Sequence, residues 1–175
     1  MSELPTTPAC PREGELASFW QTARASVPGA GLGDDYQVRW IGLDDQTTNQ
    51  VLELIHTGDK TGTFTLPWLV EQTGTPTPQI GDAIILTSFD GTPKILLRLT
   101  EIEKVAFGDM TEAHTAVDGS PVRALEVWKP LHTTYWNKRL QSFGLSVRDD
   151  MPVLVEKFEV LYDALPSSAP TPPGW

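Results

Sequence analysis

The chain has 175 residues, a length that suits one domain of ordinary size with its own core. Hydrophobic residues make up 39% of it, and no apolar run approaches the roughly 20 residues that cross a bilayer, so a membrane protein is not expected. The net charge of −10 argues against broad phosphate neutralisation, and therefore against a protein that binds double-stranded DNA.

The two ends of the chain have the composition of tails. Residues 1–14 contain three prolines and residues 164–175 are rich in Pro and Ser, which predicts disordered or extended segments around one domain at residues 15–163. The N-terminus has neither a basic head nor an apolar stretch, and the single cysteine, Cys10, can form no internal disulfide and no zinc site. We therefore expect a cytoplasmic location.

The domain begins with two predicted helices. Apolar residues recur at helical spacing over 15–27, which is typical of an amphipathic helix. A second helix is predicted after Asp44 or Asp45, either of which can cap it, and Gly58 stands where a C-terminal glycine belongs. A strand rich in Thr and Phe is predicted over 61–66.

The rest of the domain is predicted to be mostly strand. Asp90-Gly91 is a strong hairpin signal between strands predicted over 83–89 and 94–107. A short helix, a long helix that Pro130 must kink or restart, and a last strand are predicted over 110–114, 122–143 and 153–161. Because the strands do not alternate regularly with helices, an α+β fold is favoured over a doubly wound sheet.

Four segments carry a resemblance to a known family. The clearest is Gly58-Asp59-Lys60-Thr61-Gly62-Thr63, and the others lie within 36–42, 80–101 and 125–160. In order and at plausible spacing, over about residues 16–162, they resemble the ASCH domain, whose pattern includes Gly-x-Lys-Thr-x-Thr. The resemblance implies a small PUA-like β-barrel with flanking helices.

The resemblance also implies a function and no cofactor. PUA-like domains bind RNA, and some ASCH proteins resemble hydrolases that deacetylate acetylcytidine with a Lys, Thr and Glu set; RNA cleavage has also been proposed. The prediction is therefore a cleft that binds RNA, a nucleoside or a nucleotide. The alternative is an amidohydrolase of acylated nucleosides, or an RNA-cleaving enzyme.

The predicted catalytic residues are Lys60 and Thr63, with an uncertain acid. Since Lys60 and Thr63 are three residues apart, simple strand alternation would point them to opposite sides, and a turn or bulge at Gly62 would be needed to bring them together. The expected Glu aligns with Ser120, and Asp118, two residues away, is the nearest acid.

Three outcomes follow for this acid. Either Asp118 reaches the Lys-Thr pair, or Asp90 or Glu101 replaces it from the sheet, or the hydrolase chemistry is lost. Loss of the chemistry is the interpretation that the missing Glu favours.

Further ligand-binding candidates come from aromatic and charged side chains. A tryptophan can stack on a base or pack in the core, and an arginine inside an apolar strand faces either solvent or a pocket. Residues 123–148 contain five basic residues and one acid, a local net charge of +4 (5 − 1). The candidates are Trp40, Thr61, Trp68, Asp90, Arg98, Ser120, Arg123, Trp128 and His132.

Metal binding is not predicted. His114 and His132 are isolated, with no cysteine or paired histidine at metal-ligand spacing.

Three hypotheses stay open from the sequence: a nucleoside or RNA-binding module, an amidohydrolase, and a protein–protein interaction domain with a solid core in place of the cleft.

Overall fold

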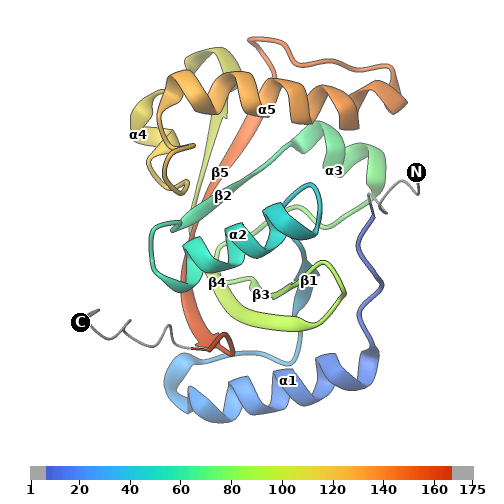
Figure 1. The fold of residues 1–175 in the computed structure, drawn as a ribbon, viewed down its shortest axis with the longest axis vertical. Coiled ribbons are helices and arrows are strands. Elements are labelled where there is room, and N and C mark those ends of the chain that lie inside the picture. Colours follow the sequence, from blue (N-terminus) through green and yellow to red (C-terminus); the bar gives the residue numbers. More distant parts are fainter. Residues whose placement is uncertain (1–6, 167–175) are drawn as a thin grey trace, which may run out of the picture.

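A computed structural model describes residues 7–166 as one mixed α+β fold, with helices around a five-stranded sheet (Figure 1). The helices are α1 (Glu13–Ser26), α2 (Asp45–His56), α3 (Pro67–Thr73), α4 (Glu112–Thr115) and α5 (Leu125–Leu140), with 3₁₀ turns η1 (Pro28–Ala30), η2 (Phe107–Asp109) and η3 (Gln141–Phe143). The strands are β1 (Gln37–Arg39), β2 (Gly62–Thr65), β3 (Ala83–Thr87), β4 (Pro93–Ala106) and β5 (Pro152–Asp163).

The sheet has the order β1-β3-β4-β5-β2. β1 pairs with β3 in parallel, and the other neighbours are antiparallel. Since β1 and β2 are the two edges and do not pair, the sheet is open within residues 7–166. The predicted α+β class is confirmed, whereas the predicted small β-barrel is not, because the sheet does not close within these residues.

Helices cover both faces of the sheet. In β3, Ala83 and Ile85 pack in the cluster that contains α1, and Ile84 and Leu86 pack in the cluster that contains α2, as the alternation of side chains along a strand requires. A third cluster, around Trp128 of α5, covers the far end of β5. Figure 1 shows α1 and α5 at opposite ends of the molecule, with α2 between them.

The predicted helix starts and turns agree with the structure. The Asp44 carboxylate caps α2 by accepting the Thr47 N–H at 2.8 Å. Gly58 follows α2 with a left-handed φ of 81°, and Gly91 closes the β3–β4 hairpin with a φ of 85°. These local signals were sufficient because each depends only on neighbouring residues.

Three elements differ from the prediction. Neither β1 nor α3 was expected. α3 begins at Pro67, directly after β2, and a proline is well tolerated in the first turn of a helix because its missing N–H would have no partner there. Trp68 is therefore the second residue of α3. The long helix is shorter than predicted, and it continues through Pro130 without a restart.

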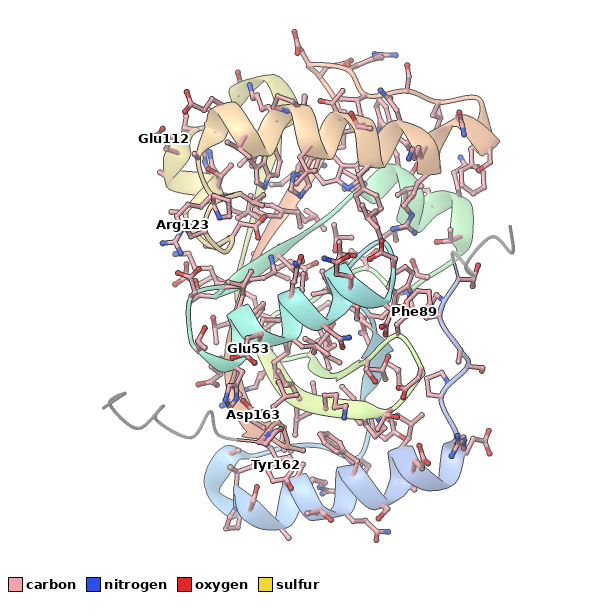
Figure 2. The ribbon with its side chains drawn as sticks, viewed as in Figure 1. Glu53, Phe89, Glu112, Arg123, Tyr162 and Asp163 are labelled. Carbon is pink, nitrogen blue, oxygen red and sulfur yellow. The ribbon has the colours of Figure 1, made fainter. Side chains whose placement is uncertain are left out.

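The two predicted tails, 1–14 and 164–175, lie partly outside the described residues. In the described part of the N-terminal tail, the Ala9 N–H donates to the carbonyl of Phe89 at 2.9 Å. Phe89 is labelled in Figure 2. The Ala164 N–H donates to the Lys94 carbonyl, also at 2.9 Å. None of the helices within residues 7–166 combines the length and apolarity that a membrane crossing needs.

Candidate functional site

A cavity of about 790 Å³ lies beside β1 and β2, the two edge strands of the open sheet, which do not pair with each other. Side chains of β1 and β2 line it, together with α2, α3, α5 and the loop before α5. In Figure 1, β2 and α3 lie between α2 and α5. Ligand pockets commonly have volumes of about 300–1,000 Å³, so this cavity is large enough for a nucleoside.

Lys60 enters the cavity from the turn that follows α2. The left-handed Gly58 reverses the chain, and the Lys60 N–H then donates to the Leu54 carbonyl of the helix at 2.9 Å. The Lys60 side chain is only 3% exposed, and its Nζ donates to Asp118 Oδ1 at 2.8 Å. A buried lysine needs such a partner, because an unpaired charge in this position would be costly.

Asp118 comes from the loop between α4 and α5. Its Oδ1 also accepts the Gly119 N–H at 2.9 Å. The Val117 carbonyl accepts the N–H groups of Thr61 and Gly62, at 2.8 and 3.1 Å, and this fixes the loop against the start of β2. Of the acids considered from the sequence, Asp118 is thus the one that reaches Lys60.

Ser120, which aligns with the expected Glu, is placed differently. It is exposed, and its N–H donates to Asp59 Oδ2 at 2.8 Å, away from the cavity lining. A carboxylate two residues earlier therefore stands beside the lysine, because the loop turns at Asp118 and Gly119.

His132 of α5 completes a cluster with Lys60 and Asp118. Its Nε2 lies 4.0 Å from Asp118 Oδ2. Its Nδ1 lies 2.9 Å from the Trp128 carbonyl, which can only accept, so Nδ1 carries the proton and Nε2 is left with a free lone pair. Burial lowers the pKa of His132 to about 4, with a smaller contribution from the positive charge of Lys60. The ring is therefore neutral at neutral pH.

Thr63 lines the same cavity from the edge strand β2. Lys60 precedes the strand, so strand alternation does not separate the two residues. Gly62 has no left-handed φ, and the predicted reason for a glycine there is wrong. A Cβ at Gly62 would lie 2.4 Å from the Glu156 carbonyl oxygen and 2.7 Å from Val117 Cβ, so this glycine permits a close approach of three segments.

Arg39 and Glu156 form a second ion pair at the cavity. Arg39 is at the end of β1 and lines the cavity, and its Nη1 donates to Glu156 Oε2 at 2.9 Å. Glu156 lies on β5, directly opposite Thr63 of β2, and its side chain is 0% exposed. Cross-strand partners point to the same face. The pair joins β1 to β5, which are not neighbours in the sheet, so it passes over one face of β3 and β4.

The other predicted ligand-binding residues divide into two groups. Trp40 lines the cavity, and Trp128 is fully buried beneath it, stacked on the His132 ring at 4.1 Å between centroids. Six lie outside the cavity lining: Thr61, Trp68, Asp90, Arg98, Ser120 and Arg123.

The charged residues outside the cavity have partners of their own. Arg98 binds Glu159 on the neighbouring strand. Arg123 pairs with Asp59, and Figure 2 shows it at the margin of the molecule. The Asp90 carboxylate accepts the Thr92 N–H at 3.0 Å within the hairpin, and hydrogen bonds from Ser88 and Thr92 lower the pKa of Asp90 to about 2. Trp68 packs against the guanidinium of Arg148 at 5.6 Å.

Sequence reasoning missed Arg39 and Glu156 as site residues. A signal was present for Glu156, since it directly follows the apolar run Val153-Leu154-Val155 in a predicted strand. A charged residue next to such a run needs a partner when it is buried. The partner is 117 positions away in the sequence, so no local pattern identifies it.

Fold and cavity together define a PUA-like α+β domain with an open sheet and a largely apolar pocket that contains the Lys60–Asp118 pair. Residues 38–162 match the family described as the ASCH domain, which is more than half of the chain. The chain belongs to the ASCH domain family.

Solved structures agree with this assignment. The chain is similar to an ASCH domain from Lactobacillus crispatus JV V101, with a TM-score of 0.75 and 22% identity over 86% of this chain and 96% of that one. It is also similar to a protein from Enterococcus faecalis V583, with a TM-score of 0.75 and 21% identity over 85% of this chain and 89% of the other. At these identities the likeness concerns the fold alone. No curated protein matches the chain.

Proposed function

We propose that the cavity binds a nucleoside-like ligand and that the chain hydrolyses an amide-linked acyl group on it, as an acylated cytidine carries. The observation that carries the proposal is the 2.8 Å contact of buried Lys60 with Asp118, beside a neutral histidine in a cavity of nucleoside size. The family resemblance, with its Lys, Thr and acid set, supports the same chemistry. A cytoplasmic location fits such a substrate.

In this mechanism His132, Lys60 and Asp118 have separate roles in amide hydrolysis. Water adds to the acyl carbon, and its proton passes to the free Nε2 of His132, which is available at any pH above about 4. The ammonium of Lys60 stabilises the oxyanion that forms, and Asp118 holds Lys60 in place. The C–N bond then breaks, and the leaving nitrogen takes the proton back from His132. The Thr63 hydroxyl orients the attacking water.

Hydrolysis is tested by incubating the chain with N4-acetylcytidine and separating cytidine by chromatography. We expect turnover in the wild type and a loss of at least about 100-fold in Lys60→Ala, since single oxyanion-stabilising donors contribute about that much. Lys138→Ala is the matched control, because Lys138 is an exposed lysine of α5. Turnover that survives Lys60→Ala would defeat the mechanism.

Binding is tested separately by tryptophan fluorescence, since Trp40 and Trp136 line the cavity. Titration with cytidine is expected to quench emission, and a short single-stranded RNA serves as the competing ligand class. Saturable quenching by RNA and not by cytidine would replace the nucleoside by RNA as the ligand. Quenching by neither would reject both ligand classes.

A further inference from the structure

The cavity is basic although the protein is acidic. Three basic side chains line it, Arg39, Lys60 and Arg139, against a single acid, Asp118, whereas the whole chain has a net charge of −10. Lys60 and Asp118 neutralise each other at 2.8 Å. Arg39, at the end of β1, is likewise paired at 2.9 Å with Glu156, which lies outside the cavity lining. This leaves Arg139 of α5 as the lining cation without a carboxylate partner among residues 7–166. Such a local excess favours an anionic ligand group.

Arg39 is held as a rigid donor and not as a flexible surface arginine. Its Nη1 donates to Glu156 Oε2 at 2.9 Å, and its Nη2 donates to Gln37 Oε1 at 3.1 Å. A guanidinium has five N–H groups, and only two are used in these bonds. The side chain keeps 22% of its surface exposed, on the side that lines the cavity.

The burial of the Glu156 carboxylate is a second observation that concerns Arg39. Its carboxylate is completely buried, and Oε1 has no hydrogen-bond partner among residues 7–166. A buried charge of this kind is expensive, and a pair of well-packed apolar residues would often be at least as stable. The pair is therefore better explained by what it does to Arg39: Glu156 fixes the orientation of the guanidinium so that its free N–H groups face the cavity.

We propose that Arg39, oriented by Glu156, is an anion subsite of the cavity that takes the phosphate of a nucleoside monophosphate. The planar, fixed fork of an arginine matches phosphate oxygens bidentately, which a lysine cannot do. This rests on the proposed function, because the base would occupy the neighbouring part of the same cavity, near Trp40 and Lys60. The substrate class then becomes an acylated nucleotide in preference to a free nucleoside.

The test compares cytidine with cytidine 5′-monophosphate in the fluorescence titration. We expect the wild type to bind the monophosphate at least about tenfold more tightly, since a charge-assisted hydrogen bond is worth that factor or more. The double variant Arg39→Gln/Glu156→Gln removes both charges together, so that neither is left buried and unpaired. It is expected to bind cytidine and cytidine 5′-monophosphate with equal affinity.

A matched control is Arg98→Gln, since Arg98 is also paired with a glutamate across the sheet but lies outside the cavity. It should keep the wild-type preference. Glu156→Gln alone, which leaves Arg39 charged but less firmly oriented, should reduce the preference. A preference that is unchanged in the double variant would overturn the proposal and leave the ion pair with a structural role only.

Inorganic phosphate separates this inference from the proposed function. Ligands that bind the folded state alone raise the melting temperature. Phosphate should raise that of the wild type and of Arg98→Gln, but not that of the double variant, with sodium chloride at equal ionic strength as the reference. If this pattern appears while cytidine neither binds nor is released from N4-acetylcytidine, the anion subsite stands and the proposed function fails. If phosphate gives no stabilisation and the monophosphate no preference, the subsite is rejected.

Discussion

Lys60 and Asp118 form a buried ion pair, so the coupling free energy between the two residues can be measured from the stabilities of their variants. Lys60→Met leaves the Asp118 carboxylate without its partner, and Asp118→Asn leaves the ammonium without its own. Breaking one side of a buried pair costs about 3 kcal/mol or more, so each variant should lower the free energy of unfolding by about that amount. Urea unfolding of both single variants and of Lys60→Met/Asp118→Asn measures it.

The double variant is the decisive comparison. It should lose clearly less than the sum of the two single losses, by about 2 kcal/mol, because contacting residues are not additive. Lys138→Met, at an exposed position, should stay within about 0.5 kcal/mol of the wild type. Strictly additive losses would contradict a buried Lys60–Asp118 pair.

The residues of this cluster could be predicted to different degrees. Lys60 and Thr63 were identified because their motif is contiguous. Asp118 was only one of several acids, since its position depends on how the loop before α5 turns. The pairing of Arg39 with Glu156 could not be predicted, because the two residues are 117 positions apart and lie on strands that are not neighbours in the sheet.

His132 makes stability depend on pH in a definite direction. Burial lowers its pKa from 6.5 to about 4. Between these values the unfolded chain binds a proton that the folded chain does not, so the free energy of unfolding falls as the pH falls, by up to about 3 kcal/mol. His132→Asn removes this titration and keeps a donor for the Trp128 carbonyl.

Urea unfolding at pH 6.5 and at pH 4 should therefore show a larger loss for the wild type than for His132→Asn. Other titrating groups, such as the His56–Asp163 pair, are present in both proteins and cancel in the comparison. Equal losses in the two proteins would mean that His132 is not held neutral.

At the scale of elements, β2 is a short edge strand whose position depends on one glycine. Ala at Gly62 would place a Cβ against the backbone of Glu156 and the side chain of Val117. Because backbone cannot yield cheaply, Gly62→Ala should lower the free energy of unfolding by about 3 kcal/mol, the upper part of the range for overpacking. The same change should shift Lys60 and Thr63 relative to each other, since both flank this residue.

Gly14→Ala is the matched control for this prediction. Gly14 lies in α1, and a Cβ there meets nothing within 4 Å. The substitution should be neutral or stabilise by up to about 1 kcal/mol, as glycine to alanine does in a helix. If thermal melting shows Gly62→Ala to be as stable as Gly14→Ala, then β2 and the Val117 loop do not approach each other as closely as described.

Elements were easier to predict than their arrangement. Adjacent residues alone determine the helix cap at Asp44, the turn at Gly58 and the hairpin at Gly91. β1 has only three residues, too few for a period to show, and it acquires strand character only by pairing with β3. The openness of the sheet is a property of strand order, for which the sequence carries no comparable signal.

For the whole molecule, α1 matters although it lies before the region that matches the family. The match begins at residue 38, whereas α1 spans Glu13–Ser26. Leu16, Trp20 and Ala23 of α1 pack against one face of the central strands, which would otherwise be exposed to water. The cooperative unit therefore extends beyond the family pattern, and the cavity on the opposite side depends on it through β3.

A chain that begins at residue 31 should accordingly fail to fold cooperatively. Its newly exposed face includes Ile85 and Leu96, which are completely buried in the full chain. Thermal melting followed by near-UV circular dichroism should show no sharp transition, with binding of a hydrophobic dye at low temperature. Within the full chain, Trp20→Ala should cost about 3 kcal/mol or more, and Ser18→Ala, on the exposed side of α1, less than about 0.5 kcal/mol. A shortened chain that melts as sharply and at the same temperature as the full one would show instead that the sheet is stable with this face uncovered.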